Sequence, residues 1–326
     1  MKTLLSRGCV AIALLASSVA VGAQAWPAKP ITWIVPFAAG GPTDAMARDI
    51  ADKVSKNIGQ QIVIENAGGA GGTIGAGKAA KATADGYTFL VGHLGYMAAA
   101  PSIYPKLSYD PLKDFEPVLR FPDTPMVLLV PTSSPYKTAD DLIAFAKKSP
   151  GKLNFAHAGA GSTSHLVAAL FASRAGVDVT TVPYKGAAPA MNDLVAGQVD
   201  AMFDQTNTAL PQVSGGRVRA IAITSPQSIP QFPGVPALAQ TALPGFEAAT
   251  WYGLYAPKGT PRDALAKLHQ AYLEALVDTA WTQRMTDQGI RLLPRKLYSA
   301  AEFSRHTAAE VDRWRKVASD AGITLE

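Results

Sequence analysis

The spacing of apolar residues near the N-terminus predicts a strand that is followed directly by a helix. Residues 31–37 form a short, mostly apolar run, which is typical of a buried strand. An apolar residue then recurs at every fourth position from Met46 to Ile58. This spacing places one apolar stripe along a helix, and Gly59 is a typical helix stop.

The same alternation of strands and helices continues along the chain. Strands are predicted at 61–65 and 87–92, with a helix over 73–81 between them. A second set begins near Met126, and a mostly helical pattern extends from Pro257 to the end. The strands of the second set are predicted at 126–130, 153–158, 179–184, 199–203 and 219–224, and its helices at 140–148 and 165–176. Strands that alternate with helices predict an α/β fold, with parallel sheets covered by helices.

Two strand-to-helix junctions consist almost entirely of small residues. The first spans 38–41, with Thr43 as the expected N-cap, and the second spans 159–164, where three hydroxyl side chains join the backbone donors. A helix N-terminus has unpaired N–H groups and the positive end of the helix dipole, so it favours anions. Ligands of open parallel sheets bind beyond the carboxyl ends of the strands. Two such loops that face each other would form an anion-binding cleft; the alternative for each loop is a tight turn.

The first 25 residues have the pattern of a secretory signal peptide. Lys2 and Arg7 form a positively charged segment before an apolar run over 9–21, and residues 23–25 match a small-x-small cleavage site. The mature chain is therefore expected to begin at Trp26, in the periplasm. No later apolar stretch is long enough to predict a membrane-spanning helix.

Composition narrows the classes of function. A chain of 326 residues with 48% hydrophobic composition can bury the core of one large or two medium domains. The formal charge of +5 falls to +3 without the two cations of the predicted signal peptide, which is too weak and scattered to favour nucleic acid. The single cysteine lies in that peptide, so disulfides, thiol catalysis and cysteine–metal sites are excluded from the mature chain.

Motif spacing argues against nucleotides and metals. Residues 72–79 match a phosphate-binding loop as far as Gly77-Lys78, but Ala79 stands where a metal-binding hydroxyl is required. The five histidines show no metal-ligand spacing. We therefore expect no cofactor and no metal.

A hydrolase remains an alternative. Ser162 and Ser164 lack the flanking glycines of a nucleophile elbow, but His157 and His165 lie close by in sequence. Asp204 ends a predicted strand, where it could cap the next helix or contact a ligand. The sequence therefore leaves open a secreted serine hydrolase beside a binding protein.

Several motifs in a fixed order resemble one family. They are "PITWIVPFAAGGPTD", "GQQIVIENAGGAGGTIGA", "ADGYTFLVG", "YPKLSYDPLKDF", "GKLNFAHAGAGSTSHLVAALF", "VPYKGAAPAMNDLVAGQVDAMFD" and "WYGLYAPKGTP". Together they cover essentially the whole mature chain. The chain resembles the substrate-binding proteins of tripartite tricarboxylate transporters, also called the Bordetella uptake gene (Bug) family.

The resemblance implies a type II periplasmic binding-protein fold, with two α/β domains that close around a ligand like a Venus flytrap. Domain 1 is predicted to comprise 26–125 and 250–326, and domain 2 to comprise 126–249. The resemblance also implies a carboxylate ligand, membrane permease subunits as partners, and a receptor that acts as a monomer without performing chemistry. A carboxylate sensor for a signalling partner is a further alternative.

The resemblance places the ligand carboxylate between the loops Phe37–Thr43 and Gly161–His165, with Asp204 as the family's acidic residue. A dicarboxylate ligand is expected. The chain departs from the family pattern at His93, Leu94 and Tyr96, which favours a reshaped distal pocket that would admit an aromatic dicarboxylate such as terephthalate. The predicted ligand-binding residues are Phe37, Ala38, Ala39, Gly40, Gly41, Thr43, His93, Leu94, His157, Gly161, Ser162, Thr163, Ser164 and Asp204.

Overall fold

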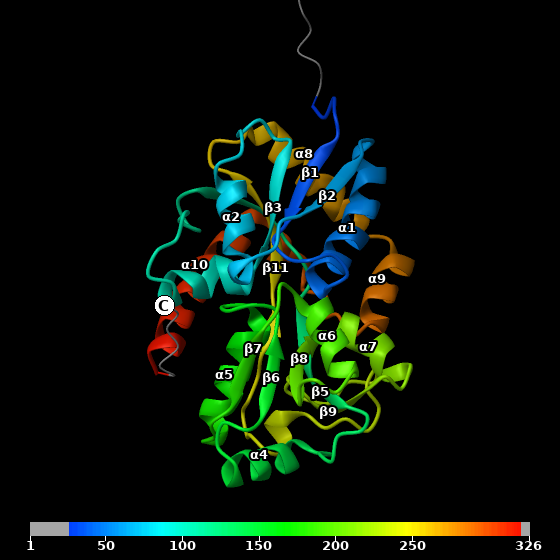
Figure 1. Cartoon of the computed structure of the whole chain (residues 1–326). Coiled ribbons are helices and arrows are strands. Elements are labelled where there is room, and N and C mark those ends of the chain that lie inside the picture. Colours follow the sequence, from blue (N-terminus) through cyan, green and yellow to red (C-terminus); the bar gives the residue numbers. More distant parts are fainter. Residues whose placement is uncertain (1–25, 321–326) are drawn as a thin grey trace, which may run out of the picture.

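Two α/β lobes, one above the other, make up the computed structural model, which describes residues 26–320 (Figure 1). The predicted signal peptide lies outside the described residues. The sheet of the upper lobe has the order β2-β1-β3-β11-β4. Its strands are β1 (Ile31–Val35), β2 (Ile62–Asn66), β3 (Thr88–His93), β4 (Phe115–Arg120) and β11 (Tyr252–Pro257).

The sheet of the lower lobe has the order β10-β5-β8-β6-β7, and β9 pairs with β5 beside this path. Its strands are β5 (Thr124–Pro131), β6 (Asn154–His157), β7 (Thr180–Pro183), β8 (Ala201–Gln205), β9 (Val218–Ile223) and β10 (Ala249–Thr250). The helices are α1 (Pro42–Ile58), α2 (Thr73–Ala80), α3 (Ala100–Ile103), α4 (Ala139–Lys148), α5 (Thr163–Ala175), α6 (Ala187–Val195), α7 (Thr206–Ser214), α8 (Arg262–Ala275), α9 (Thr279–Asp287) and α10 (Ala300–Asp320).

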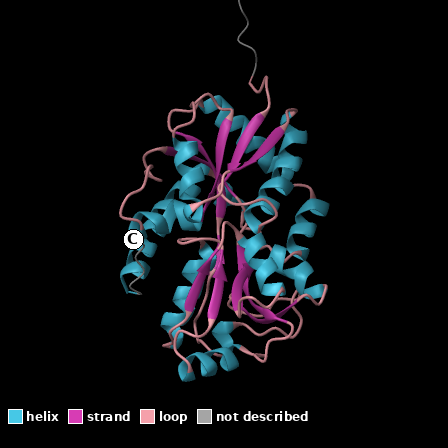
Figure 2. Ribbon diagram, viewed as in Figure 1, coloured by secondary structure: helices cyan, strands magenta, loops and turns pink. Residues whose placement is uncertain are grey.

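Helices cover both faces of each sheet (Figure 2). Alternation along β1 shows why: Trp33 packs into a core with α1, α8 and α9, while its neighbour Ile34 packs on the other face with α2 and α10. In the lower lobe α4 and α5 cover one face, and α6 and α7 the other. The central strands therefore bury side chains in both directions, and apolar runs rather than strict alternation mark them in the sequence, whereas the edge strands β2 and β7 are only partly buried.

The predicted order of strands and helices is confirmed, but the sheets are mixed rather than parallel. The pairings β1–β2 and β1–β3 are parallel, as expected. The strand β11 is antiparallel to both β3 and β4, and β5 is antiparallel to β8. The strands β4 and β11 were not predicted, because their partners lie far away in the sequence and no short-range pattern marks such a pairing.

The chain crosses between the lobes at residues 121–123 and again at Trp251. The predicted division at 125 and 250 is close to these crossings and stays a prediction. Asp123 fixes the first crossing: its carboxylate accepts hydrogen bonds from Arg120 at 2.8 Å and from Arg291 at 2.9 Å. At the second crossing the Trp251 indole donates to Glu310 in α10 at 3.0 Å. Segments near the C-terminus thus hold both crossings.

Candidate functional site

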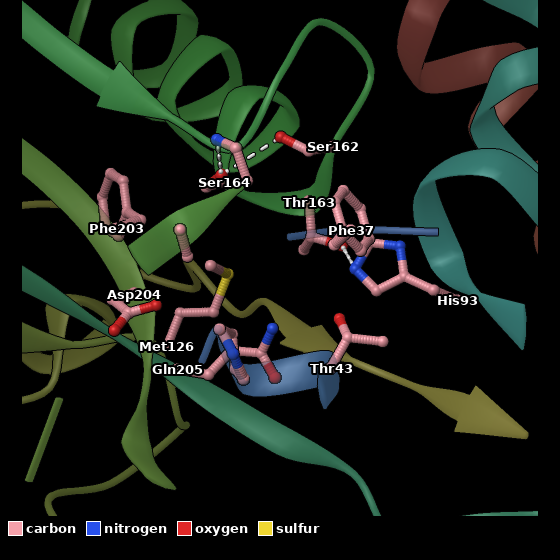
Figure 3. A pocket seen from close by; sticks show the side chains of 14 residues that line it. Phe37, Thr43, His93, Met126, Ser162, Thr163, Ser164, Phe203, Asp204 and Gln205 are labelled. Atoms are coloured by element: carbon pink, nitrogen blue, oxygen red, sulfur yellow. Dashed lines mark hydrogen bonds between the residues drawn. The ribbon is translucent and has the colours of Figure 1, made fainter. Parts of the chain in front are cut away.

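A small cavity lies where the carboxyl ends of strands from the two lobes meet (Figure 3). The space that its walls leave free is about 20 Å³, which is room for about one water molecule. The predicted residues that line it are Phe37, Gly41, Thr43, His93, Ser162, Thr163, Ser164 and Asp204. The lining residues that were not predicted are Pro42, Met126, Ala158, Ala187, Phe203 and Gln205.

Six predicted residues lie outside this lining: Ala38, Ala39, Gly40, Leu94, His157 and Gly161. Some of them hold the loops in place. The N–H of Ala38 donates to the carbonyl of Lys185 across the lobes at 3.3 Å, and the N–H of Gly161 donates to the His165 ring at 3.2 Å. His157 is buried beside His165, with 4.5 Å between the ring centroids.

The N-terminus of α1 forms one wall of the cavity. Gly41, rather than the expected Thr43, is its N-cap, because Pro42 has no N–H and takes the first helical position. Gly40 has a φ of 81° and makes the left-handed turn, whereas Gly41 has a φ of −83° that any residue adopts. The side chain of Thr43 is thereby released from capping and lines the cavity.

The N-terminus of α5 forms the facing wall and carries three hydroxyl groups. Ser162 is the N-cap, and its Oγ accepts from the N–H of His165 at 3.4 Å. The Oγ atoms of Ser162 and Ser164 are 3.1 Å apart, and Ser164 Oγ also accepts from the N–H of Ala158 at 2.9 Å. Whichever serine donates to the other, one hydroxyl proton stays available for an acceptor in the cavity.

A hydrogen bond between the lobes joins His93 at the end of β3 to Thr163 in α5. The His93 Nδ1 accepts from the N–H of Gly95 at 3.0 Å, so the neutral ring carries its proton on Nε2, which donates to Thr163 Oγ1 at 2.9 Å. Burial lowers the pKa of His93 to about 3, so the ring is neutral at ordinary pH. The hydroxyl proton of Thr163 is therefore free to bind an acceptor in the cavity.

This tautomer does not suit hydrolysis. A general base needs a free lone pair toward the hydroxyl that it activates, whereas the Nε2 of His93 donates to Thr163. His165 Nδ1 is occupied by the N–H of Gly161. Within residues 26–320, no hydrogen bond joins the Oγ of Ser162 or Ser164 to a histidine side chain.

The cavity contains donors but no cation. Of the described residues that line it, none is lysine or arginine. Burial, together with the nearby His165, lowers the pKa of His157 to about 4, so this histidine behind the second wall is also neutral. An anion would therefore be held by N–H groups and hydroxyls rather than by a salt bridge.

Two buried carboxyl groups near the cavity differ in their partners. Burial raises the pKa of Asp44, but hydrogen bonds from Arg48, the Gly40 N–H and Asn66 outweigh it, and the pKa lies below its usual range. Burial raises the pKa of Asp204 to about 6, although the Thr208 hydroxyl and the Gln205 N–H donate to it. Asp204, unlike Asp44, faces the cavity with neutral partners only.

The unpredicted residues come from long-range packing. Gln205 accepts a hydrogen bond from the Tyr252 hydroxyl of the other lobe, which leaves its amide N–H groups for the cavity. Met126 lies in β5, where every residue is buried, and Phe203 lies in β8 one residue before Asp204. The position of Gln205 at a strand's carboxyl end was a usable signal in the sequence; Met126 and Phe203 read as ordinary core residues.

No group of at least three His, Cys, Asp or Glu side chains in the described part of the chain could hold a metal ion. Between residues 26 and 320, no helix is long and apolar enough to cross a membrane.

Similarity to known proteins extends along nearly the whole chain. Residues 46–323 match the family model described as "Tripartite tricarboxylate transporter family receptor". The protein BugT of Bordetella pertussis is 36% identical over 307 residues, which are 94% of this chain and 93% of BugT.

Two solved structures share the fold and carry ligands. MatC (Rpa3494) from Rhodopseudomonas palustris, with bound malate, is 40% identical and has a TM-score of 0.85, covering 89% of this chain and 99% of that chain. Rpa4515 of R. palustris, with adipate, is 37% identical and has a TM-score of 0.87, covering 92% and 99%. The likeness therefore includes both lobes.

Proposed function

Because this chain belongs to the tripartite tricarboxylate transporter receptor family, we propose that it captures a small dicarboxylate for a membrane permease of that transporter type. The resemblance found in the sequence and the periplasmic binding-protein fold are thereby confirmed. We further propose that residues 1–25 are cleaved, that the mature receptor acts as a monomer in the periplasm, and that it binds its ligand without altering it.

The facing N-termini of α1 and α5 carry this proposal. A carboxylate taken out of water is costly unless it is hydrogen-bonded, and N–H or hydroxyl groups bind an ionised acceptor strongly. The hydroxyls of Thr163 and the serine pair supply such donors on one side, and Thr43 lies on the other. Because the closed cavity leaves only about 20 Å³ free, a bound ligand must hold the lobes slightly further apart than they lie here, which favours small ligands.

The lobes close over the cavity. The Tyr104 hydroxyl of the upper lobe donates to the carbonyl of Ala160 in the lower lobe at 2.6 Å, in addition to the His93–Thr163 bond. A ligand enters such a site only if the lobes separate, so we expect an open state before capture and the closed state after it.

A thermal-shift screen of mono-, di- and tricarboxylates, aliphatic and aromatic, tests the proposed function. The protein is recovered from the periplasm, where its chain is expected to begin at Trp26. A ligand at a hundred times its dissociation constant adds about 2.7 kcal/mol to the free energy of unfolding, which is readily visible as a rise in Tm. Each ligand that binds is expected to be recovered unchanged. No shift with any carboxylate, or turnover of an ester or amide, would contradict the proposal.

The Thr163→Val substitution is expected to weaken binding of the carboxylate found in that screen by about tenfold or more, roughly 1.4 kcal/mol. It removes the hydroxyl that donates into the cavity and leaves the buried His93 Nε2–H without its acceptor. Calorimetry gives the dissociation constant. The control is Thr180→Val, the same change at an exposed hydroxyl that bonds only Gly151, and it should leave the affinity unaltered. Equal affinities in the two variants would remove Thr163 from the site.

A further inference from the structure

Asp204 is an acceptor in the wall of a cavity that is otherwise proposed to hold an anion. It is only 2% exposed, and it lies across the cavity from His93 and Thr163, next to Phe203 and Met126 (Figure 3). Its side-chain partner is the Thr208 hydroxyl, one turn along in α7, at 2.8 Å. An ionised carboxylate here has hydrogen-bond capacity left over, since each carboxylate offers about four lone-pair sites.

The groups around Asp204 do not neutralise it. From β11 comes the Tyr252 hydroxyl, whose pKa burial raises further above its usual range, so it carries no charge. From β3 comes the neutral His93, from β5 the apolar Met126 and Val127, and from α6 Ala187. The nearest part of α1 contributes Thr43 and Pro42, and α7 contributes Asn207 and Thr208. The hollow on the far side of Asp204 is likewise lined by residues without cationic groups, as far as the described residues show.

The cavity therefore has two chemically different sides. Hydroxyls of α5, with the helix N-termini, offer donors to a carboxylate on one side, whereas Asp204 offers an acceptor between apolar neighbours on the other. Some ligands present only hydrogen-bond acceptors or carbon atoms to Asp204. The negative charge of such a ligand and that of Asp204 would then be enclosed in one small, poorly solvated space. Like charges in such a space repel strongly, and binding must then be accompanied by uptake of a proton.

We infer that the ligand is a dicarboxylate that bears a hydrogen-bond donor, a hydroxyl or an amino group, and that this donor binds Asp204 and sets the selectivity of the receptor. The inference rests on the proposed function and adds the substrate class to it. A hydroxyl or ammonium group satisfies the buried acceptor without a proton from solvent. A ligand that lacks the donor leaves Asp204 unsatisfied or requires its protonation.

Matched pairs of ligands that differ by the donor alone test this inference by calorimetry at pH 8. The pairs are malate or aspartate against succinate, 2-hydroxyglutarate against glutarate, 2-hydroxyadipate against adipate, and hydroxyterephthalate against terephthalate. A pair is informative if at least one of its members binds. In each such pair the ligand with the donor is expected to bind at least about tenfold more tightly than the ligand without it, as for a hydrogen bond to a charged group. A preference for aspartate alone would identify the donor as an ammonium, and a preference for the hydroxy acids would identify it as a hydroxyl.

The Asp204→Asn variant should reduce that preference at least about fivefold, mainly because the ligand without a donor gains affinity. The wild-type protein should also bind the ligand without a donor more tightly as the pH falls from 8 to 5, because protonated Asp204 no longer repels it. With the Asp204→Asn variant, the carboxyl groups of the ligand still titrate, but residue 204 no longer does. The affinity of the variant for this ligand should therefore depend less on pH than that of the wild-type protein. The control is Thr208→Ala, which removes the structural hydrogen bond of Asp204 but keeps its charge, and the preference should persist there.

Proton uptake provides a readout that needs no variant. When the wild-type protein binds the donor-free ligand at pH 7, the complex should take up a proton. Calorimetry shows this uptake as a binding enthalpy that depends on the ionisation enthalpy of the buffer. Its donor-bearing partner should take up none. Equal affinities within every pair, or no difference in proton uptake, would overturn the inference and leave the receptor function standing. Failure of every carboxylate to bind would contradict the receptor function itself.

Discussion

The Asp123→Ala variant should lose about 3–5 kcal/mol of its free energy of unfolding, the largest effect on stability that we expect. Asp123 and its partner Arg120 are both buried, at 5% and 7% exposure. Without the carboxylate, the Arg120 guanidinium is left as an uncompensated charge inside the first crossing between the lobes. The side-chain bond to Arg291 is lost as well, while the two backbone hydrogen bonds between residues 123 and 291 remain.

Urea denaturation of the unliganded protein measures this loss. The control is Asp312→Ala, which breaks an exposed ion pair of the same i,i+3 spacing with Arg315 and should cost less than about 1 kcal/mol. Replacing both Arg120 and Asp123 by apolar residues of similar size should restore much of the stability, because the buried charges disappear together. If Asp123→Ala were no more damaging than Asp312→Ala, the buried pair would not determine the stability of the crossing.

The Gly95→Ala variant should bind its carboxylate about a hundredfold more weakly, a loss of roughly 2.7 kcal/mol. A Cβ at Gly95 would lie 2.5 Å from the carbonyl oxygen of Gly161 in the other lobe and 3.2 Å from Nδ1 of His93. Backbone cannot give way as a flexible side chain can, so the methyl group must hold the closed lobes apart. It would also disturb the hydrogen bond that fixes the tautomer of His93.

Calorimetry and small-angle scattering with saturating ligand separate these effects. We expect the wild-type protein to contract on binding and Gly95→Ala to contract less, while its unliganded Tm changes little, because separated lobes do not make the Gly161 contact. Gly41→Ala is the comparison: its Cβ would meet nothing closer than 3.7 Å, so the loss of affinity should be less than about tenfold. Full closure of Gly95→Ala would mean that the lobes meet differently from the arrangement described above.

Local sequence patterns determined most of the elements and the character of the site. The apolar run and the fourfold spacing specify β1 and α1, and the same reasoning holds for β6 and α5, because strand and helix periodicity arise from contacts between near neighbours. The small-residue junctions identified the two helix N-termini that line the cavity. The motifs identified the family, whose model matches residues 46–323.

Tertiary structure alone decided how these parts combine. The strand β11 made the upper sheet mixed by pairing with β3, from which it is separated by the whole lower lobe in the sequence. His93 and Thr163 are 70 residues apart, and only closure of the lobes brings them within hydrogen-bond distance. The charge environment of Asp204 likewise depends on which residues surround it from six different elements. Periodicity reports which face of a strand or helix is buried; it contains no information on which distant face lies opposite.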